Sequence, residues 1–159
     1  MAEEKLPELK LPVCGVELKR DAGGTLHVYD DLRRKWLVAT PEEWVRQNFT
    51  RYLRAALGFP QSMMANEVGL TLNGTRRRCD TLIYRRNLRP LCVVEYKRST
   101  VEITAAVFDQ IARYNSVVGA PYLIVSNGMK HYCCRFDGEG YTFLRRIPRY
   151  EEMNLGEGK

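Results

Sequence analysis

Residues 76–98 contain two carboxylates, Asp80 and Glu95, whose spacing could build a hydrolytic centre. Residues 79–84 and 91–97 alternate along their length as β-strands do, and the residues between them have the length of a turn. A symmetric hairpin places Asp80 opposite Glu95, and directly opposed side chains have Cβ atoms about 4.5–5.5 Å apart. We therefore expect the two carboxylates to meet at the end of a strand pair.

Placing Asp80 opposite Glu95 destabilises the fold unless a cation binds to the two carboxylates. Like charges directly opposite one another destabilise a sheet, whereas a hard divalent cation such as Mg²⁺ binds oxygen ligands and reverses the sign of that interaction. Lys97 lies diagonally beside the pair in this register. In the alternative, the register slips by one residue, the carboxylates face water and Lys97 pairs with Glu95 on the surface. A turn centred on Asn87 and Leu88 gives two further pairings: Tyr84 with Leu91, and Leu82 with Val93.

The order of these residues resembles a known nuclease pattern. Asp80 followed by Glu95-Tyr96-Lys97 is similar to the D…ExK signature of the PD-(D/E)xK nuclease superfamily, with Cys79 where the superfamily name has proline. Residues 110–114 resemble the QxxxY motif of its RecB-like branch. With PEEWVRQ upstream and VSNG downstream, residues 40–136 are similar to the N-terminal nuclease domain of type I restriction enzyme R subunits.

The resemblance implies roles for the matching residues. Asp80 and Glu95 would ligate Mg²⁺, for which Mn²⁺ can substitute. Lys97 would orient or deprotonate the attacking water, or stabilise the charge that forms on the phosphate. Gln110 would hold Lys97 in place, and Tyr114 would contact the phosphate backbone together with nearby arginines.

The superfamily often places a glutamate on its first helix near the metal. Thr40 and Glu43 fit the N-cap and the third position of a capping box. Glu42 precedes Val45 by three residues and Phe49 by seven, so it shares their apolar face. Face geometry therefore selects Glu42. The alternative is that both glutamates only complement the helix dipole.

The remaining pattern predicts an α/β fold with a mixed central sheet flanked by helices, which agrees with the restriction-endonuclease-like core that the resemblance implies. The periodicity favours helices at 40–57 and 99–118, and it places Gln110 on the buried side of the second helix, between Val107 and Tyr114. Strands are expected at 13–19, 25–29, 35–39, 67–72, 79–84, 91–97, 122–125, 131–136 and 141–144. We expect a single domain: an arm and hairpin at 1–39, a nuclease core at 40–146 and a polar, frayed tail at 147–159.

Composition limits the class of protein. The 159 residues carry a net charge of +6, which favours an anionic partner. The basic residues gather in the hairpin, as a phosphodiester substrate would require; the alternative is a solvated basic face. The residues expected to contact nucleic acid are Arg76, Arg77, Arg78, Arg98 and Tyr114. No apolar run approaches the length of a membrane span, and the N-terminus lacks an apolar signal core, so a cytoplasmic location is expected. Five cysteines, two of them adjacent, argue against a secreted disulfide framework.

The leading hypothesis is a Mg²⁺-dependent DNA endonuclease, with DNA and restriction-modification subunits as partners. The alternative is a catalytically weak module that docks DNA or a restriction partner. The chain contains no GxxxxGK[ST] phosphate loop, so the translocase of R subunits is expected to be absent. A purely structural domain ranks last because it leaves Asp80, Glu95, Lys97 and Gln110 unexplained.

Overall fold

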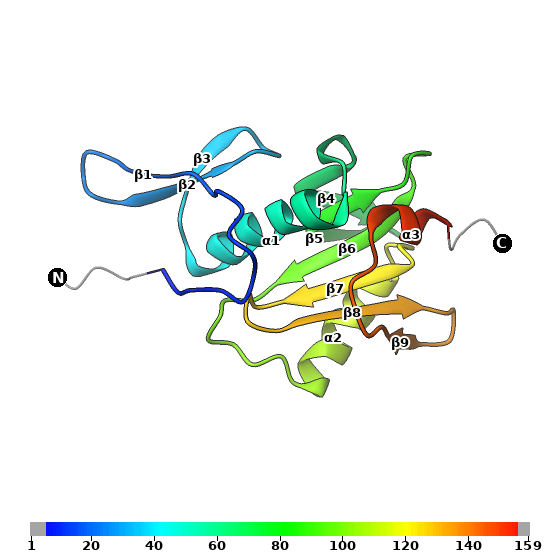
Figure 1. The fold of residues 1–159 in the computed structure, drawn as a ribbon. Helices are drawn as coiled ribbons and strands as arrows, with labels where there is room; N and C mark the ends of the chain where they lie inside the picture. The colour runs from blue at the N-terminus through cyan, green and yellow to red at the C-terminus, as the bar shows by residue number, and fades with distance from the viewer. Residues whose placement is uncertain (1–5, 156–159) are drawn as a thin grey trace.

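A six-stranded mixed sheet forms the centre of the protein, which is described by a computed structural model covering residues 6–155 (Figure 1). Its strands lie in the order β4-β5-β6-β7-β8-β9, and only β6 and β7 are parallel. The strands are β4 (Met64–Leu72), β5 (Thr75–Tyr84), β6 (Pro90–Tyr96), β7 (Tyr122–Ser126), β8 (His131–Phe136) and β9 (Tyr141–Phe143). This is the expected α/β fold, compatible with a restriction-endonuclease-like core.

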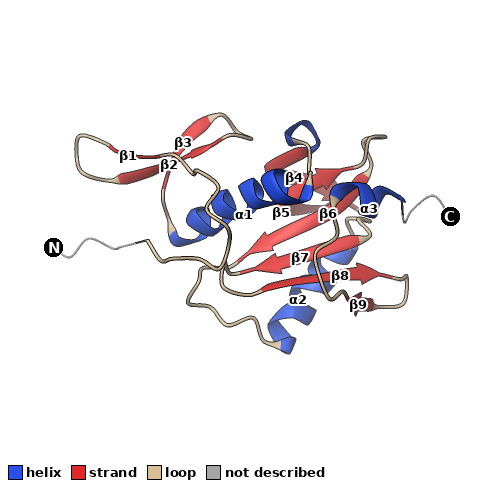
Figure 2. Ribbon diagram, in the orientation of Figure 1, coloured by secondary structure: helices blue, strands red, loops and turns tan. Residues whose placement is uncertain are grey.

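Helices cover both faces of this sheet (Figures 1 and 2). α1 (Pro41–Leu57) and α3 (Tyr150–Leu155) pack in one apolar cluster on one face. α2 (Ala105–Ser116) packs in a second cluster on the other face. Parallel neighbours need a crossover connection, and α2 lies within the one that joins β6 to β7. The strand β7 is buried along its whole length, as its continuous apolar sequence predicted.

A smaller three-stranded sheet precedes the core and projects beyond the start of α1 (Figure 1). It comprises β1 (Leu18–Arg20), β2 (Leu26–Asp30) and β3 (Lys35–Val38). Asp30, at the end of β2, is fully buried and accepts a hydrogen bond from Asn66 Nδ2 at 3.0 Å. This contact ties the small sheet to β4, which follows a short 3₁₀ turn, η1 (Gln61–Met63).

The register of the β5–β6 hairpin agrees with the expectation in its middle and departs from it at its turn. Leu82 pairs with Val93, so the one-residue slip does not occur. Tyr84 pairs with Pro90 rather than with Leu91, because the register shifts after Ile83. Such a bulge accommodates one extra residue on one strand.

The second helix begins later than expected. Thr104 caps α2 by accepting a hydrogen bond from the Val107 N–H at 3.2 Å, so residues 99–104 lie outside the helix. Its buried residues are Phe108, Ala112 and Asn115. The expected stripe through Val107 and Tyr114 is therefore wrong, because the helix presents a neighbouring face to the sheet.

The expected frayed tail is also wrong over the part that the structure describes. Tyr150 and Met153 of α3 are fully buried in the α1-side core. The Tyr150 hydroxyl donates a hydrogen bond to the carbonyl of Tyr84 at 2.9 Å, which closes α3 over the end of β5. Residues 156–159 lie outside the described residues.

Candidate metal and nucleic-acid site

The hairpin brings Asp80 and Glu95 together at the open end of the β5–β6 pair. Asp80 Oδ2 accepts a hydrogen bond from the Tyr96 N–H at 2.9 Å, which fixes the Asp80 carboxyl against β6. Glu95 Oε1 is buried and has no hydrogen-bond partner. Burial first, and then the neighbouring charge of Asp80, raise the pKa of Glu95 to about 9. Without a cation, Glu95 therefore holds its proton at neutral pH.

A cavity of about 290 Å³ opens beside this pair, between the end of β6 and α2. Lys97 reaches it because its N–H donates to the Ser126 carbonyl at 2.9 Å and so continues the path of β6 along β7. The lining residues are Glu95, Lys97, Gln110, Ile111, Tyr114 and Asn115. Gln110 and Tyr114 are four residues apart and therefore share a face of α2.

Gln110 is exposed rather than turned into the core as expected. It shares the cavity with Lys97, but no hydrogen bond joins the two side chains among the residues that the structure describes. The buried face of α2 explains this, because it runs through Phe108, Ala112 and Asn115, one residue around the helix from the expected face, and so leaves Gln110 and Tyr114 at the rim.

The chemistry of these atoms fits a hard divalent cation. Burying the Glu95 oxygen without a partner, next to a second carboxylate, costs folding free energy. The oxygens of Asp80 and Glu95 are suitable ligands for Mg²⁺ or Mn²⁺. Within residues 6–155, no three His, Cys, Asp or Glu side chains converge as a ready-made cation site. The protein side chains thus offer two ligands, Asp80 and Glu95.

The glutamate of the first helix that faces the sheet is Glu43, and the expected inward placement of Glu42 is wrong. Glu42 is exposed. Glu43 Oε1 accepts from Arg33 Nη2 at 2.8 Å and from Arg46 Nη1 at 2.9 Å. The reason is that α1 carries a polar stripe beside its apolar one, formed by Glu43, Arg46, Gln47 and Thr50. Glu43 pairs there with Arg46 of the same stripe and with Arg33 from the β2–β3 turn.

Two residues outside the sequence motifs, Arg46 and Glu67, border the carboxylate pair. Arg46 is only 4% exposed; its Nη2 donates to Glu67 Oε1 and lies 3.9 Å from Asp80 Oδ1. Glu67 interrupts the β4–β5 ladder at the position opposite Asp80, with a left-handed φ of 56°. The sequence did contain one signal for this charge network: Arg46 lies in the core-facing stretch of α1, three residues after Glu43.

A buried hydrogen-bonded chain supports the strand that carries Glu95. Thr81 Oγ1 lies 2.9 Å from the Tyr96 hydroxyl and donates to Asn66 Oδ1 at 2.6 Å. Asn66 in turn donates to Asp30, so β2, β4, β5 and β6 are linked. Because fully satisfied buried networks specify one arrangement, this chain helps to hold the site rigid.

Three of the predicted nucleic-acid contacts lie on the β4–β5 hairpin beside a second cavity of about 480 Å³. The lining residues are Gly69, Leu70, Thr71, Arg76, Arg77, Arg78 and Tyr114. The Arg77 guanidinium lies 4.5 Å from the centroid of the Tyr114 ring, and the Tyr114 hydroxyl accepts from the Arg78 N–H at 3.3 Å. Tyr114 therefore lines both cavities and connects the arginine surface with the carboxylate cavity.

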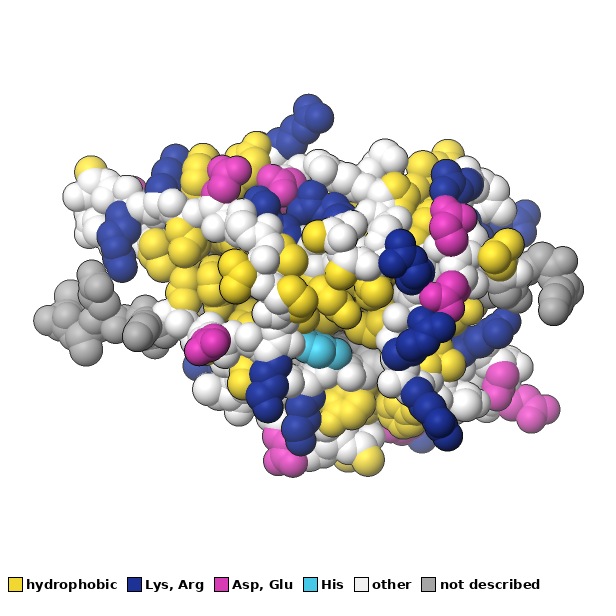
Figure 3. Space-filling view, in the orientation of Figure 1, with side chains coloured by type: hydrophobic (Ala, Val, Ile, Leu, Met, Phe, Trp, Pro, Cys, Tyr) yellow, Lys and Arg dark blue, Asp and Glu magenta, His cyan; other side chains and the backbone are white. Residues whose placement is uncertain are grey.

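Arg98 is not part of this surface. Its Nε donates to Thr100 Oγ1 at 3.1 Å, and it lines neither of the two cavities. Elsewhere the charges are mixed: the face seen in Figure 3 carries Lys and Arg side chains interspersed with Asp and Glu.

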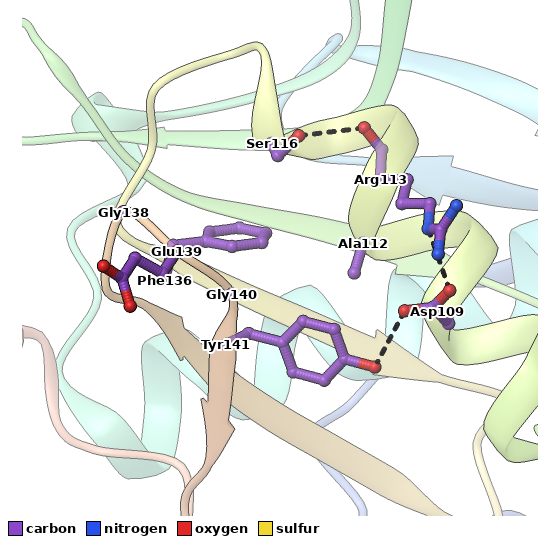
Figure 4. Close-up of a pocket in the computed structure, with 9 residues that line it drawn as sticks. All are labelled: Asp109, Ala112, Arg113, Ser116, Phe136, Gly138, Glu139, Gly140 and Tyr141. Atoms are coloured by element: carbon purple, nitrogen blue, oxygen red, sulfur yellow. Dashed lines mark hydrogen bonds and ion pairs between the residues drawn. The ribbon is translucent and has the colours of Figure 1, made fainter.

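A third cavity, of about 530 Å³, lies between α2 and the β8–β9 turn (Figure 4). There Asp109 pairs with Arg113 at 2.9 Å and accepts from the Tyr141 hydroxyl at 3.4 Å. None of the residues predicted for catalysis lines it. Its two acidic residues differ from the Asp80–Glu95 pair, because Asp109 already has partners and Glu139 is exposed.

Comparison with known proteins places this geometry in a family. Among residues 6–155, no helix combines the length and the apolar character needed to cross a membrane. No curated protein matches the sequence. Residues 41–148, well over half of the chain and including α1, the carboxylate pair and α2, match the model of the type I restriction enzyme R protein N terminus (HSDR_N). The chain therefore belongs to the family of type I restriction enzyme R protein N-terminal domains.

Proposed function

We propose that this domain is a divalent-metal-dependent DNA nuclease whose centre is Asp80, Glu95 and Lys97. The observation that carries the proposal is the buried, unpartnered Glu95 carboxyl oxygen next to Asp80, in a cavity shared with Lys97. Family membership adds a restriction-enzyme context in which DNA is the natural substrate.

Asp80 and Glu95 would hold Mg²⁺, or Mn²⁺ in its place, with the main-chain carbonyl of Tyr96 as a further oxygen ligand. When bound, the cation would polarise the scissile phosphate and lower the pKa of the attacking water. The Tyr96 N–H holds Asp80 in one orientation before any ligand arrives. Glu95 gives up its proton on becoming a ligand, so affinity for the metal rises with pH.

Lys97 supplies the positive charge on the cavity side of the pair. It orients or deprotonates the water, or stabilises the charge that builds on the phosphate. Gln110 lies at the rim of the same cavity, where a bound phosphate or water would bring it into contact with Lys97.

DNA would enter along the arginine surface of the β4–β5 hairpin. Arg76, Arg77 and Arg78 would neutralise backbone phosphates, and such contacts position DNA without reading its sequence. Tyr114 lies between this surface and the carboxylate cavity, so a strand held by the arginines leads towards Lys97.

The second candidate is a docking module that binds DNA or a restriction partner with little cleavage. One observation favours it: at this site, among residues 6–155, only Asp80 and Glu95 are available to a cation, because Glu43 and Glu67 already pair with Arg46.

Plasmid nicking in Mg²⁺, Mn²⁺ and EDTA, beside a salt-controlled DNA-binding titration, separates the two functions. Lys97→Ala should abolish cleavage while DNA affinity changes less than about tenfold, or 1.4 kcal/mol. Lys35→Ala, in β3 and away from both cavities, is the matched control and should cleave like wild type. Wild type that leaves plasmid intact in both metals, with and without restriction-modification subunits, would contradict the nuclease.

A further inference from the structure

Arg46 is a buried cation among the carboxylates of the site. Its Nη1 donates to Glu43 Oε1 at 2.9 Å, its Nη2 donates to Glu67 Oε1, and the same Nη2 lies 3.9 Å from Asp80 Oδ1. Asp80 thus stands between Glu95 and a guanidinium. In the metal-free protein, Arg46 is the positive charge nearest to Asp80 among the described ion pairs.

Burial and packing fix the position of the Arg46 side chain. The side chain is 4% exposed, and its guanidinium carbon lies 5.7 Å from the centroid of the Tyr96 ring. Glu67 meets it from a left-handed backbone conformation in the middle of a strand, which costs free energy for a residue with a side chain. Strain of this kind is typical of functional sites. Hydrogen bonds to Glu43 and Glu67 compensate the burial of this charge.

Arg46 already pairs with carboxylates that a second metal ion beside Asp80 would need as ligands. In nucleases that bind two divalent ions, the ions lie about 3.5–4 Å apart around shared oxygen ligands. Here Arg46 Nη2 lies 3.9 Å from Asp80 Oδ1, and the same guanidinium pairs with Glu43 and Glu67. Glu43 and Glu67 each hold a second cation as well, Arg33 and Arg78. A divalent ion brought to the same place would lack free ligands and would be repelled at short range.

We propose that Arg46 fills the second cation position of the carboxylate site, so that Asp80 and Glu95 take one divalent ion per chain. The inference rests on the proposed metal function and adds the number of ions to it. Arg46 is a positioning residue in this scheme, because it acts through Asp80, Glu43 and Glu67.

The test is a Mn²⁺ titration of the full chain, with free Mn²⁺ followed by electron paramagnetic resonance. Wild type should bind one ion. Arg46→Met removes the cation that Glu43, Glu67 and Asp80 share, and it leaves Arg33 on Glu43 and Arg78 on Glu67. This variant should bind two ions, whereas Arg46→Lys keeps the cation and should bind one. Arg51→Met is the matched control: Arg51 lies on the same helix and pairs with Asp31 at 3.0 Å, so the count should stay at one.

Two ions bound to wild type, or one bound to Arg46→Met, would overturn the role of Arg46 while leaving a metal site intact. No ion bound to wild type would overturn the proposed metal function as well. If Arg46→Met loses its fold in EDTA, Mn²⁺ should restore its circular dichroism spectrum with two ions bound, because the ions replace the lost charge. A variant that stays unfolded in Mn²⁺ would overturn the inference.

Discussion

Replacing Glu95 with glutamine should stabilise the metal-free domain at neutral and alkaline pH. In the folded protein, burial and the charge of Asp80 raise the pKa of Glu95 from 4.5 to about 9. The unfolded chain imposes neither effect, so its Glu95 ionises near 4.5. Glutamine keeps the size and a hydrogen-bond donor towards Asp80, and it removes the ionisation altogether.

The sign and size of this change in stability follow from the linkage between proton binding and folding. The pKa of Glu95 is higher in the folded protein than in the unfolded chain. Below pH 4.5 Glu95 is protonated in both states and does not lower the free energy of unfolding, whereas wild type loses stability as the pH rises from 4.5 towards 9. At pH 7 the solution is 2.5 units above the unfolded value, and each unit is worth about 1.4 kcal/mol. Glu95→Gln should therefore gain up to about 3 kcal/mol at pH 7 and nothing at pH 4.5.

The assay is urea unfolding in EDTA between pH 4.5 and pH 9, for wild type and Glu95→Gln. The difference in the free energy of unfolding should grow with pH up to about 9. Glu102→Gln, an exposed glutamate in the loop after β6, is the control and should follow wild type throughout. A Glu95→Gln variant that is less stable than wild type at pH 8, or that shows the same pH dependence, would refute the buried carboxylate pair.

Three further predictions concern the metal, the DNA surface and α3. Millimolar Mn²⁺ should raise the Tm of wild type by mass action on the native state and leave Glu95→Gln nearly unchanged, as differential scanning fluorimetry would show; an equal rise in both would contradict Glu95 as a ligand. Replacing Arg76, Arg77 and Arg78 together with glutamine should weaken binding to all DNA sequences alike and reduce the salt dependence by about 0.9 log units per lost phosphate contact; sequence-selective loss would count against it. Met153→Ala should cost about 2–5 kcal/mol in urea unfolding, since Met153 is fully buried, whereas a frayed tail would show no loss.

The hairpin that carries the site could be predicted from the sequence because its determinants are local. Alternation set the pairing of Leu82 with Val93, and Asn73-Gly74 forms the expected turn, with φ of 51° and 77° as a type I′ turn requires. These features brought Asp80 and Glu95 together before any tertiary contact was considered. The pairing predicted around the turn at Leu88 was wrong, because the alternation of residues does not reveal the bulge after Ile83.

The start of α2 could not be predicted because two segments offer the same cap chemistry. Ser99 and Thr104 both suit an N-cap, and tertiary contacts choose between them. Ile103 packs in the α2-side core, and Asn127 Nδ2 donates to the Val101 carbonyl at 2.8 Å, which holds residues 99–103 out of the helix. That choice also moved Gln110 to the rim of its cavity.

The charge network around Asp80 was missed for a different reason. Arg46 and Glu67 are twenty-one residues apart and belong to a helix and a strand, so no local spacing links them. The same network turns Glu43 rather than Glu42 towards the sheet. Such pairings depend on how elements pack, and only the structure reveals them.

The most direct test of the carboxylate centre is a crystal of the domain soaked in Mn²⁺ and measured near the manganese absorption edge. We expect one anomalous peak per chain, between Asp80 and Glu95, with Arg46 still paired with Glu43 and Glu67. Crystals that show no peak between Asp80 and Glu95 at millimolar Mn²⁺ and pH 8 would contradict the metal-dependent nuclease.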